Sequence, residues 1–495
     1  MTNNLKRKKR RVRRSRTVST KPSVSVWLRS RGLGFIWAPI GMMRVLLFGL
    51  RDSVLMMSLP VGLLIFVSSI DFLVLTNIRG AAEDVFYSNL PKTNINPLRG
   101  AAEELKKQYM AFVYVFILML GLLNWRKVKE YFQSWPHFLI LFFILLATSI
   151  VSLDQTKVIT NTVLIFIALL AAVLFAIPHG NSDRYIRYYL IVLIPILILH
   201  CVSLYMLSIY NVNLFEFISS DRRYGGLVGG PNTLGAGSVL GIWAASCLIL
   251  SRQITFLLRV LAIFSIMVFS LTLSTTGSGT AIFSTVVVLV LLFGMRFLSG
   301  FHPSYRVVVI AGFSMLVILA VIVGLLLSTP SDLYLTIVDK LGKDATLTGR
   351  TELWELARLA IAERPLIGWG FDSHYSVKSD PAYDVRYNHY HNGFLDSIVA
   401  GGFILFIWIL YNFTLMIHVF RRVFARQQNA FPLILPLFLL LILNISEYSL
   451  LRPSSQLWLI YLVSFTLLVS AVKFPEYITN NSRVRRRRRR KVHRS

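Results

Sequence analysis

The chain has 495 residues, of which 55% are hydrophobic and 15% charged. A water-soluble domain cannot bury that much apolar surface, so the composition favours an integral membrane protein. The formal net charge of +29 is concentrated at the two ends, where residues 1–31 carry 12 Lys/Arg, residues 483–495 carry 9, and neither stretch has an acidic residue. Neither tail contains a recognisable nucleic-acid-binding module, so we expect both to contact anionic lipid rather than nucleic acid.

Apolar stretches long enough to cross a bilayer recur along the whole chain. A spanning helix needs about 20 mostly apolar residues, and the fold class predicted is an all-α polytopic membrane protein with about 12 transmembrane helices. Residues 34–50 are a weaker candidate, which we expect to lie along the inner membrane surface. The expected spans are 53–76, 109–125, 136–153, 158–178, 188–210, 233–250, 255–275, 279–299, 306–328, 393–419, 431–448 and 455–473.

The charges of the short loops predict how these spans are oriented. With the N-terminus in the cytoplasm, the cytoplasmic loops are all basic, among them R126-K-V-K129, while the opposite loops are poorer in net positive charge. The longest opposite loop, 329–390 between spans nine and ten, has 7 Lys/Arg against 9 Asp/Glu. We therefore expect both termini to be cytoplasmic, with a large extracytoplasmic loop and no cleaved signal peptide. The expected divisions are a basic tail with an interfacial segment (1–52), an N-terminal membrane bundle (53–328), the large loop (329–392), C-terminal membrane helices (393–474) and a second basic tail (475–495).

Another extracytoplasmic segment, residues 77–108, departs from this charge pattern, because its five basic and four acidic residues nearly cancel. It contains a short repeat, R79-G-A-A-E-D84 and R99-G-A-A-E-E104. Two copies do not make a solenoid. We interpret them as two short amphipathic helical turns on the outer surface.

The first motif with chemical potential is D221-R-R-Y-G-G-L-V-G-G-P-N232, which leads into an expected span. Four glycines and a proline predict a tight loop to which another group can approach closely. Arg222 and Arg223, together with the free backbone N–H groups at the start of the next helix, would form an anion site. An ordinary turn whose arginines contact lipid phosphates is the alternative.

The second motif, residues 348–370, predicts an amphipathic helix that is too short and too polar to cross the membrane. Pro365 ends this helix. Arg350 stands at its N-terminus, where the helix dipole also favours an anion. A solvated charge near a helix cap is the alternative. The residues that share the apolar face are Leu353, Leu356, Ala357 and Ala360.

The third motif is N388-H-Y-H-N392, directly before an apolar run. A neutral imidazole at His391 can accept a proton from a hydroxyl near neutral pH. The alternative is that His389 and His391 are polar anchors at the membrane surface. No metal site is predicted, because the nearby acids lack a recognisable ligand spacing and the two cysteines, Cys201 and Cys247, lie in apolar runs.

All three motifs fall on the predicted outer face. Two of them offer positive charge to an anion and the third offers a base, so an amphipathic substrate with an anionic head, such as a lipid diphosphate sugar, fits them. A transporter or lipid flippase would instead place ionisable residues along a path through the spans. The candidates for such a path are Asp71, His200 and Glu447, and each lies near a predicted helix end.

The order of these motifs resembles the O-antigen ligase and O-antigen polymerase superfamily, which includes exopolysaccharide polymerases. The resemblance covers about residues 160–470. The segments that carry it are R223-Y-G-G-L-V-G-G-P-N232, L271-T-L-S-T-T-G-S-G-T-A281, G349-R350, P365-L-I-G-W-G370, and H391-N392 before Leu395 and Gly401-Gly402.

This resemblance implies a metal-independent, inverting glycosyltransferase without a cofactor, which moves a glycan from a polyprenyl diphosphate carrier to a glycan or lipid-linked glycan acceptor outside the cytoplasmic membrane. By the same resemblance Arg223 and Arg350 hold the diphosphate, and His391 orients or deprotonates the acceptor hydroxyl. The residues expected to assist in binding the substrates are Arg222, Pro231, Asn232, Gly349 and Asn392.

One position departs from the family pattern: Gly279 stands where many members have an arginine, so Arg222 could supply that contact. The sequence does not separate a ligase, which transfers a finished glycan, from a polymerase, which joins repeat units. The Ser/Thr/Gly-rich turn at 274–280 slightly favours a polymerase of the exopolysaccharide type.

Overall fold

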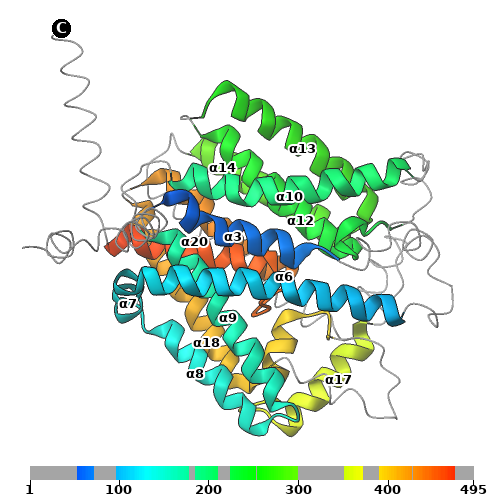
Figure 1. Ribbon diagram of the computed structural model, residues 1–495, viewed down its shortest axis with the longest axis vertical. Helices are drawn as coiled ribbons and strands as arrows, with labels where there is room; N and C mark the ends of the chain where they lie inside the picture. The colour runs from blue at the N-terminus through cyan, green and yellow to red at the C-terminus, as the bar shows by residue number, and fades with distance from the viewer. Residues whose placement is uncertain are drawn as a thin grey trace, which may run out of the picture. The chain divides into compact units, whose positions relative to one another are not determined.

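The computed structural model describes residues 53–71, 96–177, 184–209, 223–251, 254–298, 350–371, 389–425 and 427–473. Within these ranges every regular element is helical, as the sequence predicted (Figure 1). All the helices belong to one compact unit, Val54–Ser495. They are α3 (Val54–Ser69), α6 (Asn96–Leu123), α7 (Trp125–Ser134), α8 (His137–Ala147), η2 (Thr148–Val151), α9 (Gln155–Ala176), α10 (Arg184–Ile209), η3 (Gly226–Val228), α12 (Pro231–Leu250), α13 (Phe256–Thr276), α14 (Gly279–Leu298), α17 (Arg350–Glu363), α18 (Gly393–Phe424), η5 (Gln428–Ile434), α19 (Leu435–Leu443) and α20 (Gln456–Lys473).

The lengths of the described helices agree with a multi-pass membrane protein. Seven of them are long and apolar enough to cross a bilayer, or eight if the bent pair α7–α8 forms one span. The expected spans at 53–76, 431–448 and 455–473 correspond to three shorter apolar helices. The expected span 306–328 and the interfacial segment 34–50 lie outside the described residues, so the number of about 12 spans stays a prediction.

Large apolar side chains cover the outer surface of several helices. On α6, Phe112 and Leu122 expose 69% and 74% of their area, and on α13, Leu257 and Met267 expose 77% and 60%. Water-soluble proteins rarely expose contiguous apolar surface on this scale. These faces therefore contact lipid, and burial against neighbouring helices is confined to their opposite sides.

Helix α12 lies among α10, α13 and α14 and packs closely against them because small residues face its neighbours. A Cβ on Gly241 would stand 2.4 Å from the ring of Phe269 on α13. His200 on α10 is buried beside α12, where its Nε2 lies 3.1 Å from the Ser238 hydroxyl and its Nδ1 2.8 Å from the Ile196 carbonyl oxygen. Nε2 thus links α10 to α12 while Nδ1 contacts the preceding turn of α10, so His200 has a structural role in the packing of these helices.

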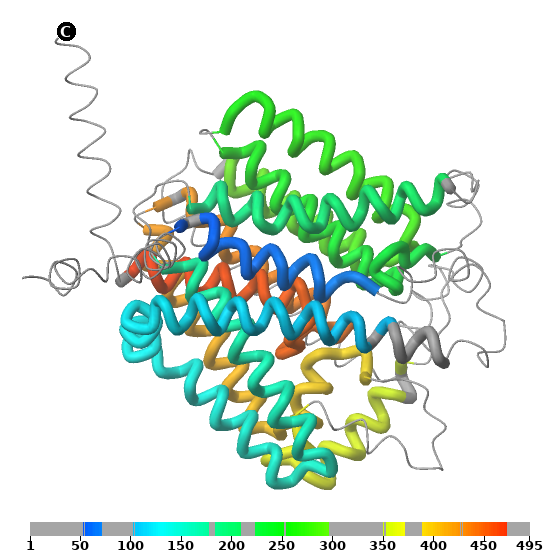
Figure 2. Tube along the Cα trace, viewed as in Figure 1, coloured from blue at the N-terminus to red at the C-terminus, as the bar shows by residue number. Residues whose placement is uncertain are grey.

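The C-terminal helix α20 packs against α9, although almost three hundred residues separate the two in sequence (Figure 2). The Thr466 hydroxyl donates to the Ala172 carbonyl oxygen at 3.1 Å, and the Ser470 hydroxyl donates to that of Ala176 at 2.7 Å. In a membrane such hydrogen bonds fix helix register, because water does not compete for the same groups. The last described helix is thereby tied to a helix of the N-terminal half.

Two segments of the N-terminal half are helical over a longer stretch than expected. The predicted loop R126-K-V-K129 lies inside helix α7, which buries Val128, Tyr131 and Phe132 and meets the next helical segment at 86° near Pro136. An amphipathic pattern made this segment helical despite its charge. The second RGAAEE copy is likewise no separate turn, because it belongs to the continuous 28-residue helix α6. The first copy lies outside the described residues.

Helix α18 is broken at Gly401 and Gly402, and the segment after α17 fills the break. Gly402 has φ 64°, and a Cβ there would lie 2.1 Å from the Leu366 carbonyl oxygen. The Phe403 N–H donates to the Pro365 carbonyl oxygen at 2.8 Å, and the Trp369 N–H donates to that of Val399 at 2.9 Å. The P365–G370 segment thus satisfies backbone groups that the break exposes, and it joins α17 rigidly to α18.

Candidate active site

Arg223 is held by the turn between α13 and α14. Its Nε donates to the Thr276 carbonyl oxygen at 3.1 Å, and its side chain lies against Gly277, where a Cβ would come within 3.3 Å of Arg223 Cγ. Gly277 adopts φ 56°, the left-handed conformation that ends many helices. Arg223 Nη2 also donates to the Asn232 side-chain oxygen at the start of α12. The turn at Gly277 and the start of α12 therefore both fix the orientation of the Arg223 guanidinium.

Glu447, in the segment after α19, links this arginine to a second one. The Asn232 amide donates to Glu447 Oε1 at 2.6 Å, and Arg350 Nη2 lies 3.2 Å from the same oxygen. The Arg350 and Glu447 side chains are 19% and 21% exposed. We call Arg223, Asn232, Arg350 and Glu447 the Glu447 network; it joins residues from three separate parts of the chain.

Burial and charge act in opposite directions in this network. Burial raises the pKa of Glu447 above its usual value, while Arg350, Arg223 and the Asn232 hydrogen bond oppose that rise. Burial lowers the pKa of Arg350, Glu447 raises it, and Arg223 lowers it further. The two guanidinium groups thus repel each other, so an additional anion between them is favourable.

His391 lies beside this network. Its Nδ1 is 4.0 Å from Glu447 Oε2, and its ring centroid is 4.0 Å from that of His389. The His391 backbone has φ 51°, which is uncommon outside glycine and costs about 1–3 kcal/mol. The backbone N–H of His391 donates to His389 Nδ1 at 3.1 Å. His389 therefore helps to fix the conformation that aims His391 at the network.

The helix that follows holds the histidines in place. Asn392 caps α18, since its side-chain oxygen accepts hydrogen bonds from the N–H groups of Phe394 and Leu395 at 3.0 and 3.1 Å. The buried Asp396 accepts from the Tyr390 N–H at 3.2 Å, and the Trp354 indole on α17 donates to the Tyr390 carbonyl oxygen at 3.0 Å. Asn392 thus acts on His391 through the backbone.

The structure brings together most of the residues selected from the sequence. Arg223, Asn232, Arg350 and His391 all contact Glu447 or one of its partners. Pro231 is the first residue of α12 and presets the helical conformation there. Arg222 and Gly349 lie outside the described residues, so their expected roles stay predictions.

Sequence reasoning missed the role of Glu447, which it considered only as part of a transport path. The expected span 431–448 is a 3₁₀ turn followed by α19, which ends at Leu443, so Glu447 stands in the following segment. Asn444 ends this helix and turns the chain, because its side-chain oxygen accepts the N–H groups of Ser449 and Leu450 at 2.8 and 2.9 Å. The polar cluster N444-I-S-E-Y448 at the end of an apolar run was the available signal.

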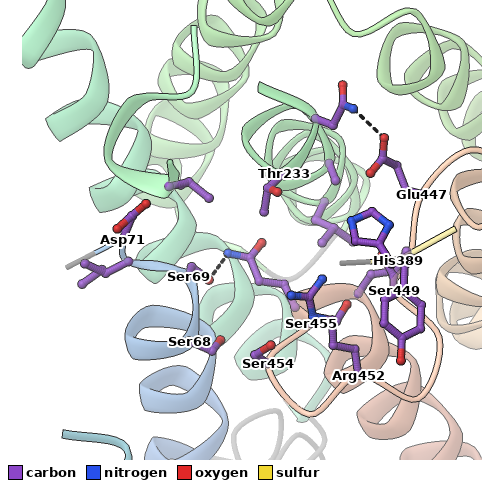
Figure 3. A pocket seen from close by; sticks show the side chains of 18 of the residues that line it. Ser68, Ser69, Asp71, Thr233, His389, Glu447, Ser449, Arg452, Ser454 and Ser455 are labelled. Carbon is purple, nitrogen blue, oxygen red and sulfur yellow. Dashed lines mark hydrogen bonds between the residues drawn. The ribbon is translucent and has the colours of Figure 1, made fainter. Parts of the chain in front are cut away.

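A cavity of about 550 Å³ opens beside the Glu447 network (Figure 3). Glu447, Asn232 and His389 line one side of it. Asp71, just after the end of α3, also lines the cavity. The Asp71 side chain packs on Gly229, and the Asp71 backbone N–H donates to the Leu227 carbonyl oxygen at 2.9 Å. The cavity thus meets the network at Glu447 and Asn232, which in turn contact Arg350 and Arg223. Among the described residues no group of His, Cys, Asp and Glu is arranged to hold a metal ion.

Together, the fold and site define a multi-pass helical membrane protein with a charged, cavity-forming site where helix ends meet. Residues 260–410 match the family model described as O-antigen ligase. These residues include Arg350 and His391 but not Arg223 or Glu447. The chain is also 30% identical, over 141 residues, to the exopolysaccharide production protein ExoQ of Rhizobium meliloti (strain 1021); the match spans 27% of this chain and about a third, 32%, of that protein. Both findings support the resemblance to the O-antigen ligase and O-antigen polymerase superfamily that the motif order indicated.

Proposed function

We propose that this protein is a glycosyltransferase that moves a glycan from a polyprenyl diphosphate carrier to a sugar hydroxyl at the outer face of the bacterial inner membrane. It would act in surface polysaccharide synthesis, as an O-antigen ligase or as a repeat-unit polymerase. The observation that carries this proposal is the convergence of Arg223, Arg350 and His391 on Glu447. The similarity to the exopolysaccharide production protein favours a role in exopolysaccharide synthesis.

The two arginines are suited to the diphosphate of the donor. As the bond from the anomeric carbon to the diphosphate breaks, the leaving oxygen gains negative charge. Planar guanidinium groups bind such oxygens with paired hydrogen bonds. Because Arg223 and Arg350 are fixed by their own contacts before the reaction, they stabilise this charge without rearrangement. They would supply the charge neutralisation that a divalent cation supplies elsewhere, so we propose a metal-independent reaction.

His391 is suited to activate the acceptor. The acceptor oxygen forms a bond to the anomeric carbon while its proton passes to the imidazole, and the diphosphate leaves with the electron pair of the broken bond. Glu447, 4.0 Å from His391 Nδ1, would stabilise the imidazolium that forms. Attack on the side opposite the leaving diphosphate would invert the anomeric configuration.

The test is a transfer assay with the full-length protein in lipid nanodiscs and a synthetic polyprenyl diphosphate glycan as donor. We expect transfer in the presence of a metal chelator and a product of inverted configuration by NMR. A retained configuration, or a requirement for a metal ion, would exclude the proposed chemistry. In cells that lack the gene, short lipid-linked units would accumulate if it is a polymerase, and full-length chains would remain on the carrier if it is a ligase.

A further inference from the structure

The cavity extends well beyond the Glu447 network. Its volume of about 550 Å³ lies within the range of about 300–1,000 Å³ usual for small-molecule sites. Figure 3 shows Glu447 and His389 on one side, Asp71 with Ser68 and Ser69 on the other, and Arg452, Ser454 and Ser455 along the wall between them. Arg223 and Arg350 are not among the residues that line this cavity, so a diphosphate bound to them would leave it for another group.

Two cations line the cavity: Arg452 on the wall between its two sides, and Lys106 on the side of Ser68 and Asp71. Lys106 on α6 donates to the Ser68 and Ile70 carbonyl oxygens at 3.2 and 3.1 Å, and these contacts fix its ammonium group at the end of α3. The Arg452 guanidinium lies over the Tyr448 ring at 5.6 Å from its centroid. Both side chains line the same cavity and repel each other, while Asp71 attracts Lys106. We call Lys106, Arg452 and Asp71 the Lys106 cluster; its two cations face one carboxylate.

The rest of the lining offers hydrogen-bond partners and an aromatic ring. Hydroxyl groups can donate and accept, as the hydroxyls of a sugar require. The Gln456 amide donates to the Ser69 hydroxyl across the wall, and Tyr448 supplies a ring at the boundary of the two parts. The serines that line the cavity are Ser68, Ser69, Ser449, Ser454 and Ser455.

A second recess of about 200 Å³ shares His389, Tyr448, Arg452 and Ser454 with this cavity. Its other lining residues include Tyr114 on α6 and Asn161 on α9. Space therefore continues from the His389 and Tyr448 side of the cavity toward Tyr114 on α6 and Asn161 on α9. A chain-like ligand can extend through it.

We propose that this cavity binds the acceptor glycan and that Lys106 and Arg452 bind an anionic group on that glycan. The inference rests on the glycosyltransferase proposed above. The acceptor hydroxyl lies at the end formed by Glu447 and His389, and the anionic group lies at the Lys106 cluster. The group is a carboxylate or phosphate, carried either by an acidic sugar or by the diphosphate of a second lipid-linked glycan.

The test measures binding of two disaccharides to the full-length protein in nanodiscs without any donor. One disaccharide ends in glucuronate, and its neutral counterpart ends in glucose. We expect the acidic disaccharide to bind at least about tenfold more tightly, since hydrogen bonds to ionised groups are the stronger ones. Lys106→Gln and Arg452→Gln should each remove most of this preference and leave binding of the neutral disaccharide unchanged.

Two further variants separate charge recognition from folding. Lys106→Arg retains the positive charge and should retain the preference. Lys107→Gln changes the neighbouring lysine, which is 73% exposed and pairs with Glu104, and should bind both disaccharides as the wild type does. Equal affinity of the wild type for the two disaccharides would overturn the proposal. So would a Lys106→Gln variant that keeps the preference.

The same experiment distinguishes this inference from the proposed reaction. Selective binding of the acidic disaccharide without any transfer from the donor would overturn the glycosyltransferase and leave the anion site. Equal transfer rates to both acceptors would overturn the anion site and leave the glycosyltransferase. Displacement of the acidic disaccharide by a short-chain prenyl diphosphate in Arg350→Gln would support a second lipid-linked glycan as the source of the anion, and failure of displacement would support an acidic sugar.

Discussion

The Glu447 network and the Lys106 cluster face the same cavity but hold their charges differently. In the network, two arginines, an asparagine and a carboxylate are joined by direct contacts of 2.6 and 3.2 Å at Glu447. In the cluster, Lys106 is fixed by backbone carbonyl oxygens and Arg452 by an aromatic ring, so neither cation needs a carboxylate to hold its position.

This difference separates two tasks. A network of linked, mostly buried charges is fixed before the reaction and can stabilise charge that develops in the transition state. Cations held by neutral groups can bind an anion in the ground state and select for it. Changes in the network should therefore lower the rate by orders of magnitude, whereas changes in the cluster should alter which acceptor is used.

The largest effect is expected for His391→Ala. Loss of a general base lowers rates by about 10²–10⁴-fold, so kcat/KM for transfer should fall by that factor in the reconstituted assay. His418→Ala, on the exposed face of α18, is the matched control and should retain wild-type activity. Wild-type kinetics of the His391 variant would remove the imidazole from the reaction.

Arg350→Lys should be nearly as severe, with a loss of about 10²–10³-fold in kcat/KM. A lysine keeps the charge but cannot bind diphosphate oxygens through a planar pair of N–H groups. The loss should appear with every acceptor, because the donor is the substrate that loses its contact. Arg358→Lys, on the exposed face of the same helix, should have no effect. A defect confined to one acceptor would place Arg350 with the acceptor instead.

Glu447→Gln should lower kcat by about tenfold and change the pH profile. The carboxylate is the form that pairs with the arginines, and burial raises its pKa, so the wild type should lose activity on acidification at a higher pH than an exposed glutamate would cause. The glutamine cannot titrate, so this component of the acidic limb should disappear. The control is Glu355→Gln, a half-exposed surface residue that pairs with Arg358. An unchanged profile would show that Glu447 is only structural.

Gly402→Ala tests the support beneath the site rather than the site itself. The substitution places a Cβ 2.1 Å from the Leu366 carbonyl oxygen at φ 64°, so we expect a loss of about 1–3 kcal/mol and a lower Tm in nanodiscs. Gly294→Ala on α14 is the control, because a Cβ there meets nothing within 4 Å, and its Tm should stay within a few degrees of the wild type. Equal melting temperatures would mean that the loop tolerates displacement.

The sequence alone determined the class of protein and most helix positions. In a membrane, apolar runs such as those of α12 and α13 can satisfy all their backbone N–H and C=O groups only by forming helices. The order of the motifs indicated the family resemblance. The glycine-rich loop, the start of the amphipathic helix and the histidine before an apolar run, together with the family resemblance, selected Arg223, Arg350 and His391.

Only the tertiary structure decided which of these residues meet. Glu447 joins residues separated by 97 and 215 positions, and no local pattern encodes contacts at that distance. The Lys106 cluster likewise combines α6 with the segment before α20. The P365–G370 segment pairs with the break in α18 through backbone hydrogen bonds. These are possible because Gly401 and Gly402 have no side chains there. Local sequence fixes helices because their hydrogen bonds are local, whereas the site is fixed by packing between distant segments.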